Sequence, residues 1–384
     1  MKRYLFWMGL ILLFSACRSD EVFYDVEEVH EVTYPVPDAK VTGFYLLNEG
    51  NMGMNRASID FFDYTTGMYH RNIYPSRNPT IVKELGDVGN DIQVYRNRLY
   101  AIINVSNYLE VMDLSGRHIK SIEIPNCRYI IFKGDKAYVS SYATPVSIDP
   151  TAGRGLVFEL DLHSLELTRK VEVGYQPEEM VIRKNRLYVA NSGGYRVPNY
   201  DHTVSVIDLD SFEELKQIDV AINLHRMELD SRGDIYVSSR GDYYHIHSNL
   251  FVIDGETEEV VHTFDLPVGN MTMVGDSLYY YSVEWSYLTN SNEISYGIID
   301  TKTRKKVSDK VITDGTEKQI KIPYGLSVNP ETKEIFITDA QNYVVTGLLY
   351  CFNSKGEFQW KTWAGNIPAH LTFIGQEELV TPFN

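Results

Sequence analysis

The sequence predicts an all-β protein, a seven-bladed β-propeller whose blades each contain four strands. Segments 92–102 and 180–190 align without a gap, and each is followed by a further match, at 108–114 and 203–209. An Asp or Asn near the end of the third strand marks each repeat, and these markers lie 46 to 53 positions apart. The markers are Asp63, Asp113, Asp161, Asp208, Asp254, Asp300 and Asn353. Repeats of about 40 to 50 residues with four strands are typical of propeller blades, so seven markers predict seven blades.

Within each repeat, short segments rich in Val, Ile, Leu and Tyr predict strands, and no helical period competes with them. Each marker can accept a hydrogen bond from the backbone N–H two residues on, so we interpret the markers as starting tight turns and not as catalytic groups. The first repeat lacks its inner strand, whereas an extra strand, 369–374, follows the seventh. We expect this C-terminal strand to join the sheet of 43–48 and close the ring, which removes open sheet edges.

The N-terminal residues are predicted to export and anchor the protein. A basic start precedes an apolar stretch at 4–14, which is too short to span a bilayer and is typical of a signal peptide. The small residues before Cys17 resemble the lipobox at which bacterial lipoproteins are cut and acylated. Asp20 and Glu21 resemble the signal that sends lipoproteins of Bacteroidota to the outer face of the outer membrane. The expected boundaries are a signal peptide at 1–16, a lipidated acidic tether at 17–40 and the propeller at 41–384.

Composition and charge limit the possible partners. The 384 residues are 43% hydrophobic, which is enough for a large core, and carry a formal net charge of -16 with no marked basic run. Such a charge repels nucleic acid, so we expect no nucleic-acid partner. Cys127 and Cys351 lie in strand-like segments without metal-ligand spacing, which favours buried free thiols.

The predicted topology places the long loops on one side of the disc, because alternate connections of an antiparallel blade emerge on opposite sides. The connections between first and second strands and between third and fourth strands are tight. The second-to-third connections are long, at 140–155, 191–202, 238–249 and 282–295, and the segment 75–90 joins the same side. We call this side the long-loop face. Long loops that gather on one face usually carry function.

The composition of these loops predicts a ligand-binding surface. Tyr and Trp provide rigid, flat apolar area with a polar tip, and polar neighbours can satisfy the edge of a ligand. The candidate ligand-binding residues are Tyr142, Asn191, Tyr195, Tyr200, Arg240, Asp242, Tyr243, Tyr244, His245, His247, Trp285, Tyr287 and Tyr343. The simpler interpretation is that about half of the aromatic residues only pack the loops together.

The stretch 240–249, RGDYYHIHSN, allows three interpretations. An Arg-Gly-Asp adhesion motif is rejected because the tripeptide often occurs by chance. His245 and His247 could bind a metal ion together, but no further ligand lies at a diagnostic spacing, so no metal site is assigned. A loop that contacts a ligand through Tyr243, Tyr244 and the histidines is the favoured interpretation.

The chain resembles a known family along essentially its whole mature length. Segment 47–63, the repeated RLYV and VIDL strands, and segment 324–358 are similar to the YncE-like propeller lipoproteins of Bacteroidota. Within that group the sequence is similar to the BtuG lipoproteins, which capture cobalamin at the cell surface and pass it to a TonB-dependent outer-membrane transporter. The resemblance implies a lipid-anchored outer-membrane protein that faces the cell exterior, binds a corrinoid, acts with such a transporter, and is neither an enzyme nor the holder of a cofactor.

Two other functions stay open. A lactonase-like propeller hydrolase would hold Ca²⁺ in the central channel, using residues where the inner strands begin. Those residues are Asn90, Asp91, Arg128, Tyr129, Glu178, Glu179, His225, Arg226, Asn270, Tyr324 and His370. The cationic members oppose a divalent ion, and the chain has neither a GxSxG nor an HExxH motif. The other alternative is a transporter-associated scaffold that binds protein and no small molecule.

Overall fold

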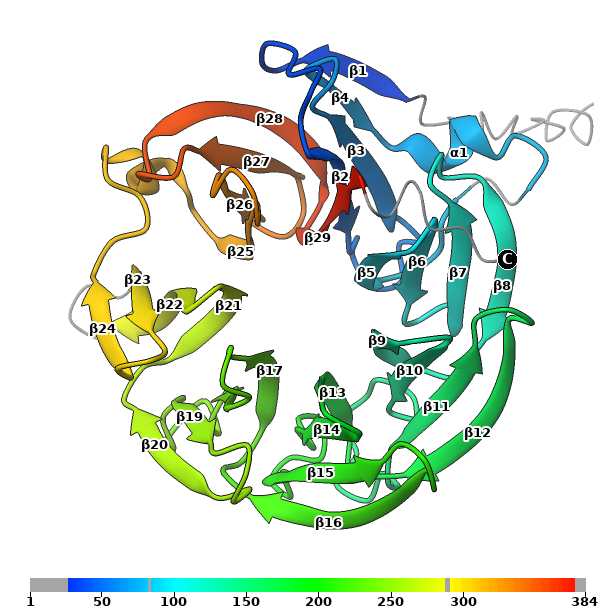
Figure 1. The fold of residues 1–384 in the computed structure, drawn as a ribbon, viewed down its shortest axis with the longest axis vertical. Coiled ribbons are helices and arrows are strands. Elements are labelled where there is room, and N and C mark those ends of the chain that lie inside the picture. The colour runs from blue at the N-terminus through cyan, green and yellow to red at the C-terminus, as the bar shows by residue number, and fades with distance from the viewer. Residues whose placement is uncertain (1–26, 82–83, 287–290, 377–384) are drawn as a thin grey trace, which may run out of the picture.

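Seven antiparallel sheets surround a central channel, as Figure 1 shows. The computed structural model describes residues 27–81, 84–286 and 291–376. Six of the sheets have four strands, and the sheet of blade one has five. The prediction of a seven-bladed β-propeller is confirmed. No described helix is long and apolar enough to cross a membrane.

In each blade the strands follow one another from the channel wall to the outer rim. Blades one to three comprise β29 (Pro368–Gly375), β2 (Val41–Asn48), β3 (Ser58–Asp63), β4 (Met68–Arg71) and β1 (Glu28–Glu31); β5 (Gly89–Tyr95), β6 (Arg98–Ile103), β7 (Tyr108–Asp113) and β8 (His118–Glu123); and β9 (Cys127–Lys133), β10 (Lys136–Ser141), β11 (Leu156–Asp161) and β12 (Glu166–Glu172). Blades four and five comprise β13 (Pro177–Arg183), β14 (Arg186–Asn191), β15 (Thr203–Asp208) and β16 (Glu213–Asp219); and β17 (Leu224–Leu229), β18 (Ile235–Ser239), β19 (Leu250–Ile253) and β20 (Val260–Phe264). Blades six and seven comprise β21 (Val268–Val274), β22 (Ser277–Ser286), β23 (Ser291–Asp300) and β24 (Lys305–Ser308); and β25 (Pro323–Val328), β26 (Ile335–Asp339), β27 (Thr346–Phe352) and β28 (Phe358–Asn366). The helix α1 (Ile73–Arg77) precedes blade two, and the 3-10 helix η1 (Thr316–Gln319) precedes blade seven.

The C-terminal strand closes the ring as predicted. β29 pairs antiparallel with β2, and Phe373 lies opposite Phe44 in this ladder. The strand is the innermost one of blade one, so it supplies the channel-lining strand that the first repeat lacks. Blade one is thereby built from both ends of the described chain, and the ring has no open inner edge.

Blade one also has an additional outer strand. β1 lies within the segment that the sequence analysis assigned to the tether, and it pairs antiparallel with β4. Glu28 accepts a hydrogen bond from Nη2 of Arg71 at 2.7 Å, and Glu27 contacts Nδ1 of His70 at 2.8 Å. The ordered sheet therefore begins before residue 41, at the rim of the disc.

The core is divided among the interfaces between blades. Seven clusters of buried apolar side chains each join two neighbouring blades, and the last joins blade seven to blade one. Cys127 and Cys351 are both free thiols buried in such clusters, as the sequence predicted. Burial of these faces stabilises the ring by roughly 25 cal/mol for each Å² of apolar surface removed from water.

The marker residues start the turns between third and fourth strands. In six of them a side-chain oxygen accepts the backbone N–H two residues on; Asp300 instead accepts that of Thr303, three residues on. Because a turn of this kind depends only on neighbouring residues, it could be predicted from the sequence.

Two predicted connections differ from the structure. Residues 282–295 were expected to form a long loop, but β22 and β23, with ten residues each, form a long hairpin in which Ser282 pairs with Ser295. Apolar and polar residues alternate there as a two-stranded ribbon requires, and Val283 pairs with Ile294 in the extended ladder. In blade one the fourth strand ends at Arg71, and α1 follows and extends into the connecting segment 75–90.

Candidate functional site

Every inner strand has a β-bulge near its beginning, at the end of the channel that meets the long loops. In all seven described ladders between first and second strands, the inner strand contains one extra residue relative to its neighbour. The segments at the bulges are Asn90, Arg128–Tyr129, Glu178–Glu179, His225–Arg226, Gly269, Tyr324–Gly325 and Ala369. A bulge re-aims side chains locally, so these segments turn polar groups into the channel where the rest of the strand cannot.

Hydroxyl groups on the second strands support three of these bulges. The backbone N–H of Tyr129 donates to Oγ of Ser140 at 3.1 Å, and that of Arg226 donates to Oγ of Ser238 at 3.1 Å. The N–H of Gly325 likewise donates to Oγ1 of Thr338 at 2.6 Å. The bulge breaks the normal ladder, and the hydroxyls satisfy buried N–H groups that would otherwise lack a partner.

A cavity of about 310 Å³ lies at this end of the channel, which we call the channel mouth. It is lined by Glu49, Gly50, Asn51, Met52, Val88, Asn90, Asn104, Val105, Arg128, Tyr129, Val146, Tyr195, His225, Arg226, Arg240, Tyr324 and Ile367. The lining combines bulge residues of blades two, three, five and seven with residues from the long loops. The bulges and the long-loop face therefore meet at one concave site.

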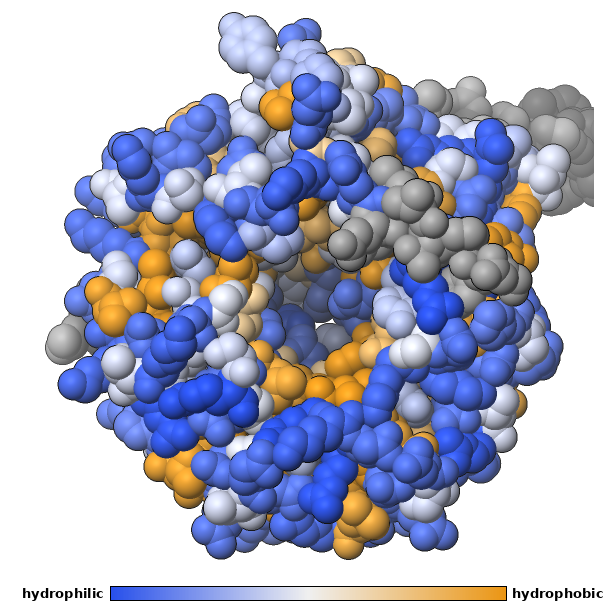
Figure 2. Space-filling view, in the orientation of Figure 1, coloured by the Kyte–Doolittle hydropathy of each residue, from blue (hydrophilic) through white to orange (hydrophobic). Residues whose placement is uncertain are grey.

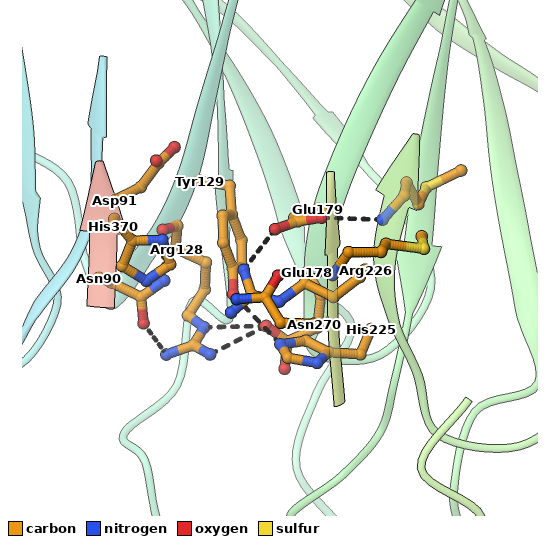
Figure 3. A network of polar contacts seen from close by, with 12 residues as sticks. Asn90, Asp91, Arg128, Tyr129, Glu178, Glu179, His225, Arg226, Asn270 and His370 are labelled. Atoms are coloured by element: carbon orange, nitrogen blue, oxygen red, sulfur yellow. Dashed lines mark hydrogen bonds and ion pairs between the residues drawn. The ribbon is translucent and has the colours of Figure 1, made fainter. Parts of the chain in front are cut away.

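Glu178 is the centre of the polar network in Figure 3. Its side chain is 0% exposed, and Oε2 accepts hydrogen bonds from Nε and Nη2 of Arg128 at 3.2 and 2.9 Å. Its Oε1 accepts from the Tyr142 hydroxyl at 2.5 Å and lies 3.4 Å from Nη1 of Arg240. Burial acts to raise the pKa of Glu178, but the charges of Arg128 and Arg240 outweigh it and hold the pKa below its usual value. Glu178 is therefore an ionised counter-ion beneath the cavity.

His225 is held as a neutral hydrogen-bonding group. Its Nε2 lies 2.8 Å from Nη2 of Arg240 and 3.3 Å from the hydroxyl of Tyr129. Burial and the neighbouring guanidinium groups of Arg240, Arg226 and Arg128 lower the pKa of His225 well below its usual value. An uncharged imidazole can accept the hydrogen bond from Arg240, and so orients that guanidinium group at the cavity wall.

The wall formed by blades one and seven has the opposite character. Glu49 accepts a hydrogen bond from the Tyr324 hydroxyl at 2.8 Å, and its other oxygen lies 3.6 Å from Nε2 of His370. Tyr324 in turn packs edge to face against Tyr343, with ring centroids 6.0 Å apart. The cavity thus has guanidinium groups on the side of blades three to five and a carboxylate on the side of blades one and seven.

Exposed apolar side chains lie on the long loops of the face that contains the mouth. We call them the apolar rim, and they are Met52, Met54, Ile148, Tyr195, Val197, Tyr243, Tyr244, Ile246, Tyr343, Val344 and Val345. They come from the loops of blades one, three, four, five and seven. Exposed apolar side chains that gather on one face beside polar groups are typical of a binding site for a ligand or a protein.

Some of the predicted ligand-binding residues lie at the mouth. Tyr195 and Arg240 line the cavity. Five more are exposed on the surrounding loops, namely Tyr243, Tyr244, His245, His247 and Tyr343, and Tyr200 is partly exposed. Trp285 lies in β22 but its side chain is outside the described part of the structure, and Tyr287 lies outside the described residues.

Three other predicted residues have structural roles that sequence analysis did not anticipate. Tyr142 is only 1% exposed and binds Glu178, and Asn191 is fully buried in blade four, where Nδ2 donates to Thr203 and Ser205. These two residues cannot reach a ligand in the cavity because other side chains cover them. Asp242 accepts backbone N–H groups at 244, 245 and 246, so it shapes its own loop. These hydrogen bonds lower the pKa of Asp242 to about 2.

Several residues that line the cavity were not among the candidate ligand-binding residues predicted from the sequence. Arg128, Tyr129, His225 and Arg226 line the cavity but were considered only as positions for a calcium site, and Glu49 was not considered at all. The first four share a place at the beginning of an inner strand, which was the available signal, whereas Glu49 follows the second strand of blade one. Among the described residues, no group of three or more His, Cys, Asp or Glu side chains could hold a metal ion.

The opposite end of the channel is more apolar. Figure 2 shows the central hollow with apolar side chains over β13 and β17, where a cavity of about 550 Å³ is lined by residues that include Met180, Val181 and Met227. Two carboxylates at this end accept hydrogen bonds from the inner strand of the next blade. Glu179 accepts from the backbone N–H of Met227 at 2.8 Å, and Glu228 accepts from the backbone N–H of Met273 at 3.2 Å. Burial, together with the charge of Glu179, raises the pKa of Glu228 to about 8. These acids therefore join blades.

Fold and site together define a β-propeller with a polar cavity at one channel mouth. The chain belongs to the DUF5074 family, a domain of unknown function, whose model matches residues 42–366. No curated protein matches the chain.

Several solved structures are similar to the chain in fold. A hypothetical selenium-binding protein from Sulfolobus tokodaii has a TM-score of 0.62 and 14% identity, over 88% of this chain and 96% of that one. A quinoprotein alcohol dehydrogenase-like protein from Bacteroides thetaiotaomicron has a TM-score of 0.57 and 12% identity, over 87% and 78%. Hydrazine synthase from Kuenenia stuttgartiensis has a TM-score of 0.54 and 16% identity, over 69% and 76%. Identities this low show a shared fold alone.

Proposed function

We propose that this protein is a surface lipoprotein that captures a small molecule at the channel mouth and passes it to a TonB-dependent outer-membrane transporter. A corrinoid is the proposed ligand. The observation that carries the proposal is a polar cavity of about 310 Å³ on the same face as the exposed apolar rim. Small-molecule sites combine apolar contact area with a few fixed polar groups in this way.

A corrinoid suits this arrangement because its macrocycle is broad, partly apolar and fringed with amides. The cavity is too small to enclose a whole corrinoid, so the macrocycle would lie across the mouth. Tyr195, Tyr243 and Tyr244 then supply flat contact, while Arg240 and Tyr324 reach polar groups that enter the cavity. The ligand class itself comes from the resemblance to cobalamin-capturing lipoproteins.

The charges at the mouth favour ligand capture over a calcium-dependent hydrolase. A divalent cation at the beginning of the inner strands would meet the guanidinium groups of Arg128, Arg226 and Arg240. Asp91 and Glu179 are also occupied, because each accepts a backbone N–H from the next blade at 3.0 and 2.8 Å. The apolar rim equally favours the second candidate, a scaffold that docks onto a transporter and binds no small molecule.

The test is a calorimetric titration of cyanocobalamin into the full-length protein in detergent. Tyr244→Ala removes an 81% exposed rim side chain, and Tyr34→Ala is the matched control, since Tyr34 is 84% exposed and lies beside the short turn at Gly67. We expect Tyr244→Ala to weaken binding about tenfold or more and Tyr34→Ala to leave it unchanged. Absence of heat with the wild type would refute corrinoid capture and favour the scaffold. Equal affinities in all three proteins would move the site away from the rim.

A further inference from the structure

The cavity wall of blades three to five offers guanidinium groups while keeping their counter-ions out of the cavity. Arg128, Arg226 and Arg240 all line it. Glu178 neutralises Arg128 and Arg240, and its side chain is 0% exposed. Glu179 accepts a hydrogen bond from Nη1 of Arg226 and lines the cavity at the opposite end of the channel. A ligand group at this wall therefore faces the guanidinium groups, while the carboxylate of Glu49 lies on the wall of blades one and seven.

The three arginines differ in how many of their donors are used. In Arg128 every guanidinium nitrogen already donates to a protein group, Nε and Nη2 to Glu178 and Nη1 to Asn90. Arg226 donates from Nη1 to Glu179, and its buried Nε has no hydrogen-bond partner among the described residues. Arg240 makes one short contact, to His225, and one long contact of 3.4 Å to Glu178. Arg226 and Arg240 thus keep donor capacity for a ligand.

Both of these arginines border the same phenol. The guanidinium carbon of Arg226 lies 5.8 Å from the ring centroid of Tyr129. The hydroxyl of Tyr129 and Nη2 of Arg240 both contact Nε2 of His225, at 3.3 and 2.8 Å. Two guanidinium groups and a phenol hydroxyl grouped in this way match the oxygens of a carboxylate or phosphate, which arginine binds in pairs of hydrogen bonds.

We infer that the channel mouth contains an oxyanion subsite, in which Arg226, Arg240 and Tyr129 bind a phosphate or carboxylate group of the captured ligand. The inference rests on the proposed function and narrows it to ligands with such a group. Cobalamin carries one phosphodiester, in its nucleotide loop, whereas cobinamide has the same macrocycle and lacks that phosphate. The subsite therefore discriminates between two corrinoids.

The experiment compares cyanocobalamin and dicyanocobinamide by calorimetry on full-length wild type, Arg240→Gln and Arg186→Gln. Arg186 is the control, because its replacement removes the same charge from the other end of an inner hairpin, where it pairs with Glu258. We expect Arg240→Gln to weaken cobalamin binding about tenfold and leave cobinamide binding within about twofold. Arg186→Gln should change neither affinity. Equal weakening for both corrinoids, or none for either, would overturn the phosphate assignment.

If neither corrinoid binds, that result refutes corrinoid capture but does not test the oxyanion subsite. A second measurement therefore tests the subsite directly. Inorganic phosphate or acetate is added in place of chloride at constant ionic strength, and the thermal midpoint is recorded. We expect phosphate, acetate or both to raise the midpoint of the wild type and of Arg186→Gln but not of Arg240→Gln. The more effective anion identifies the group as phosphate or carboxylate. Equal midpoints in both anions and chloride, or equal shifts in all three proteins, would overturn the subsite.

Discussion

Glu178→Gln should destabilise the propeller, since Glu178 is the buried counter-ion of the channel mouth. The substitution keeps the size of the side chain but removes the charge that faces Arg128 at 2.9 Å and Arg240 at 3.4 Å. Breaking one side of a buried ion pair costs about 3 to 5 kcal/mol. Arg128 keeps its hydrogen bond to Asn90 and its position over the Tyr142 ring, 4.8 Å from the centroid, so we expect the lower end, about 3 kcal/mol.

Urea unfolding of the full-length protein at several pH values measures this loss. The folded-state pKa of Glu178 lies below its usual value of 4.5, so its ionised form stabilises the fold above pH 4.5. That contribution is lost as the pH falls from 4.5 through the lower folded-state pKa, and the gap between wild type and Glu178→Gln should narrow over this range. Glu256→Gln is the control, since Glu256 is exposed and pairs with Arg183 and Lys184. Equal effects of the two substitutions, or a gap that stays constant with pH, would refute the reasoning.

Three further predictions concern the ring, the thiols and the anchor. Truncation after Ile367 removes β29 and exposes the edge of β2, so we expect oligomers or aggregates in light scattering; a monomer of unchanged midpoint would contradict the closure argument. Burial raises the pKa of the Cys127 thiol to about 12, so alkylation at pH 8 should require unfolding; rapid reaction of the folded protein would show that the core opens. Cys17→Ser should release the protein from membranes on fractionation, and unchanged membrane retention would contradict lipidation.

The blade number and ring closure could be predicted because their signals are local or countable. An Asx turn such as that at Asp113 depends on residues within a few positions of one another, and a missing first strand can be matched to a surplus last strand. The hairpin of β22 and β23 was missed because Ser, Asn and Glu there favour a loop as isolated residues. Cross-strand pairing overrides that preference, and a single sequence does not show the pairing.

The site was only partly predictable, because the role of a polar residue depends on what lies across the channel. Tyr142 and Asn191 have the composition of ligand contacts, yet both are buried and bind other protein groups. Glu178 and Arg128 are 50 positions apart in the sequence, and only the ring brings them together as an ion pair. The position of Arg128 and Arg226 at the channel was predictable from strand order, whereas the distribution of their counter-ions was not.

The seven bulges imply that this scaffold can change its ligand without being refolded. Most bulge side chains lie outside the inter-blade clusters that stabilise the ring, although Tyr129 belongs to one of them. Two of the seven bulges, at Gly269 and Ala369, present almost no side chain to the mouth. Substitution at one bulge therefore keeps the ring, but it also changes the bulges that contact it, as Glu178 contacts Arg128 of the neighbouring blade. The mouth thus has seven bulge positions, and in the present combination the bulges of blades three and five carry arginines, Arg128 and Arg226. Relatives with the same turns and strands but a different combination should select different cargo.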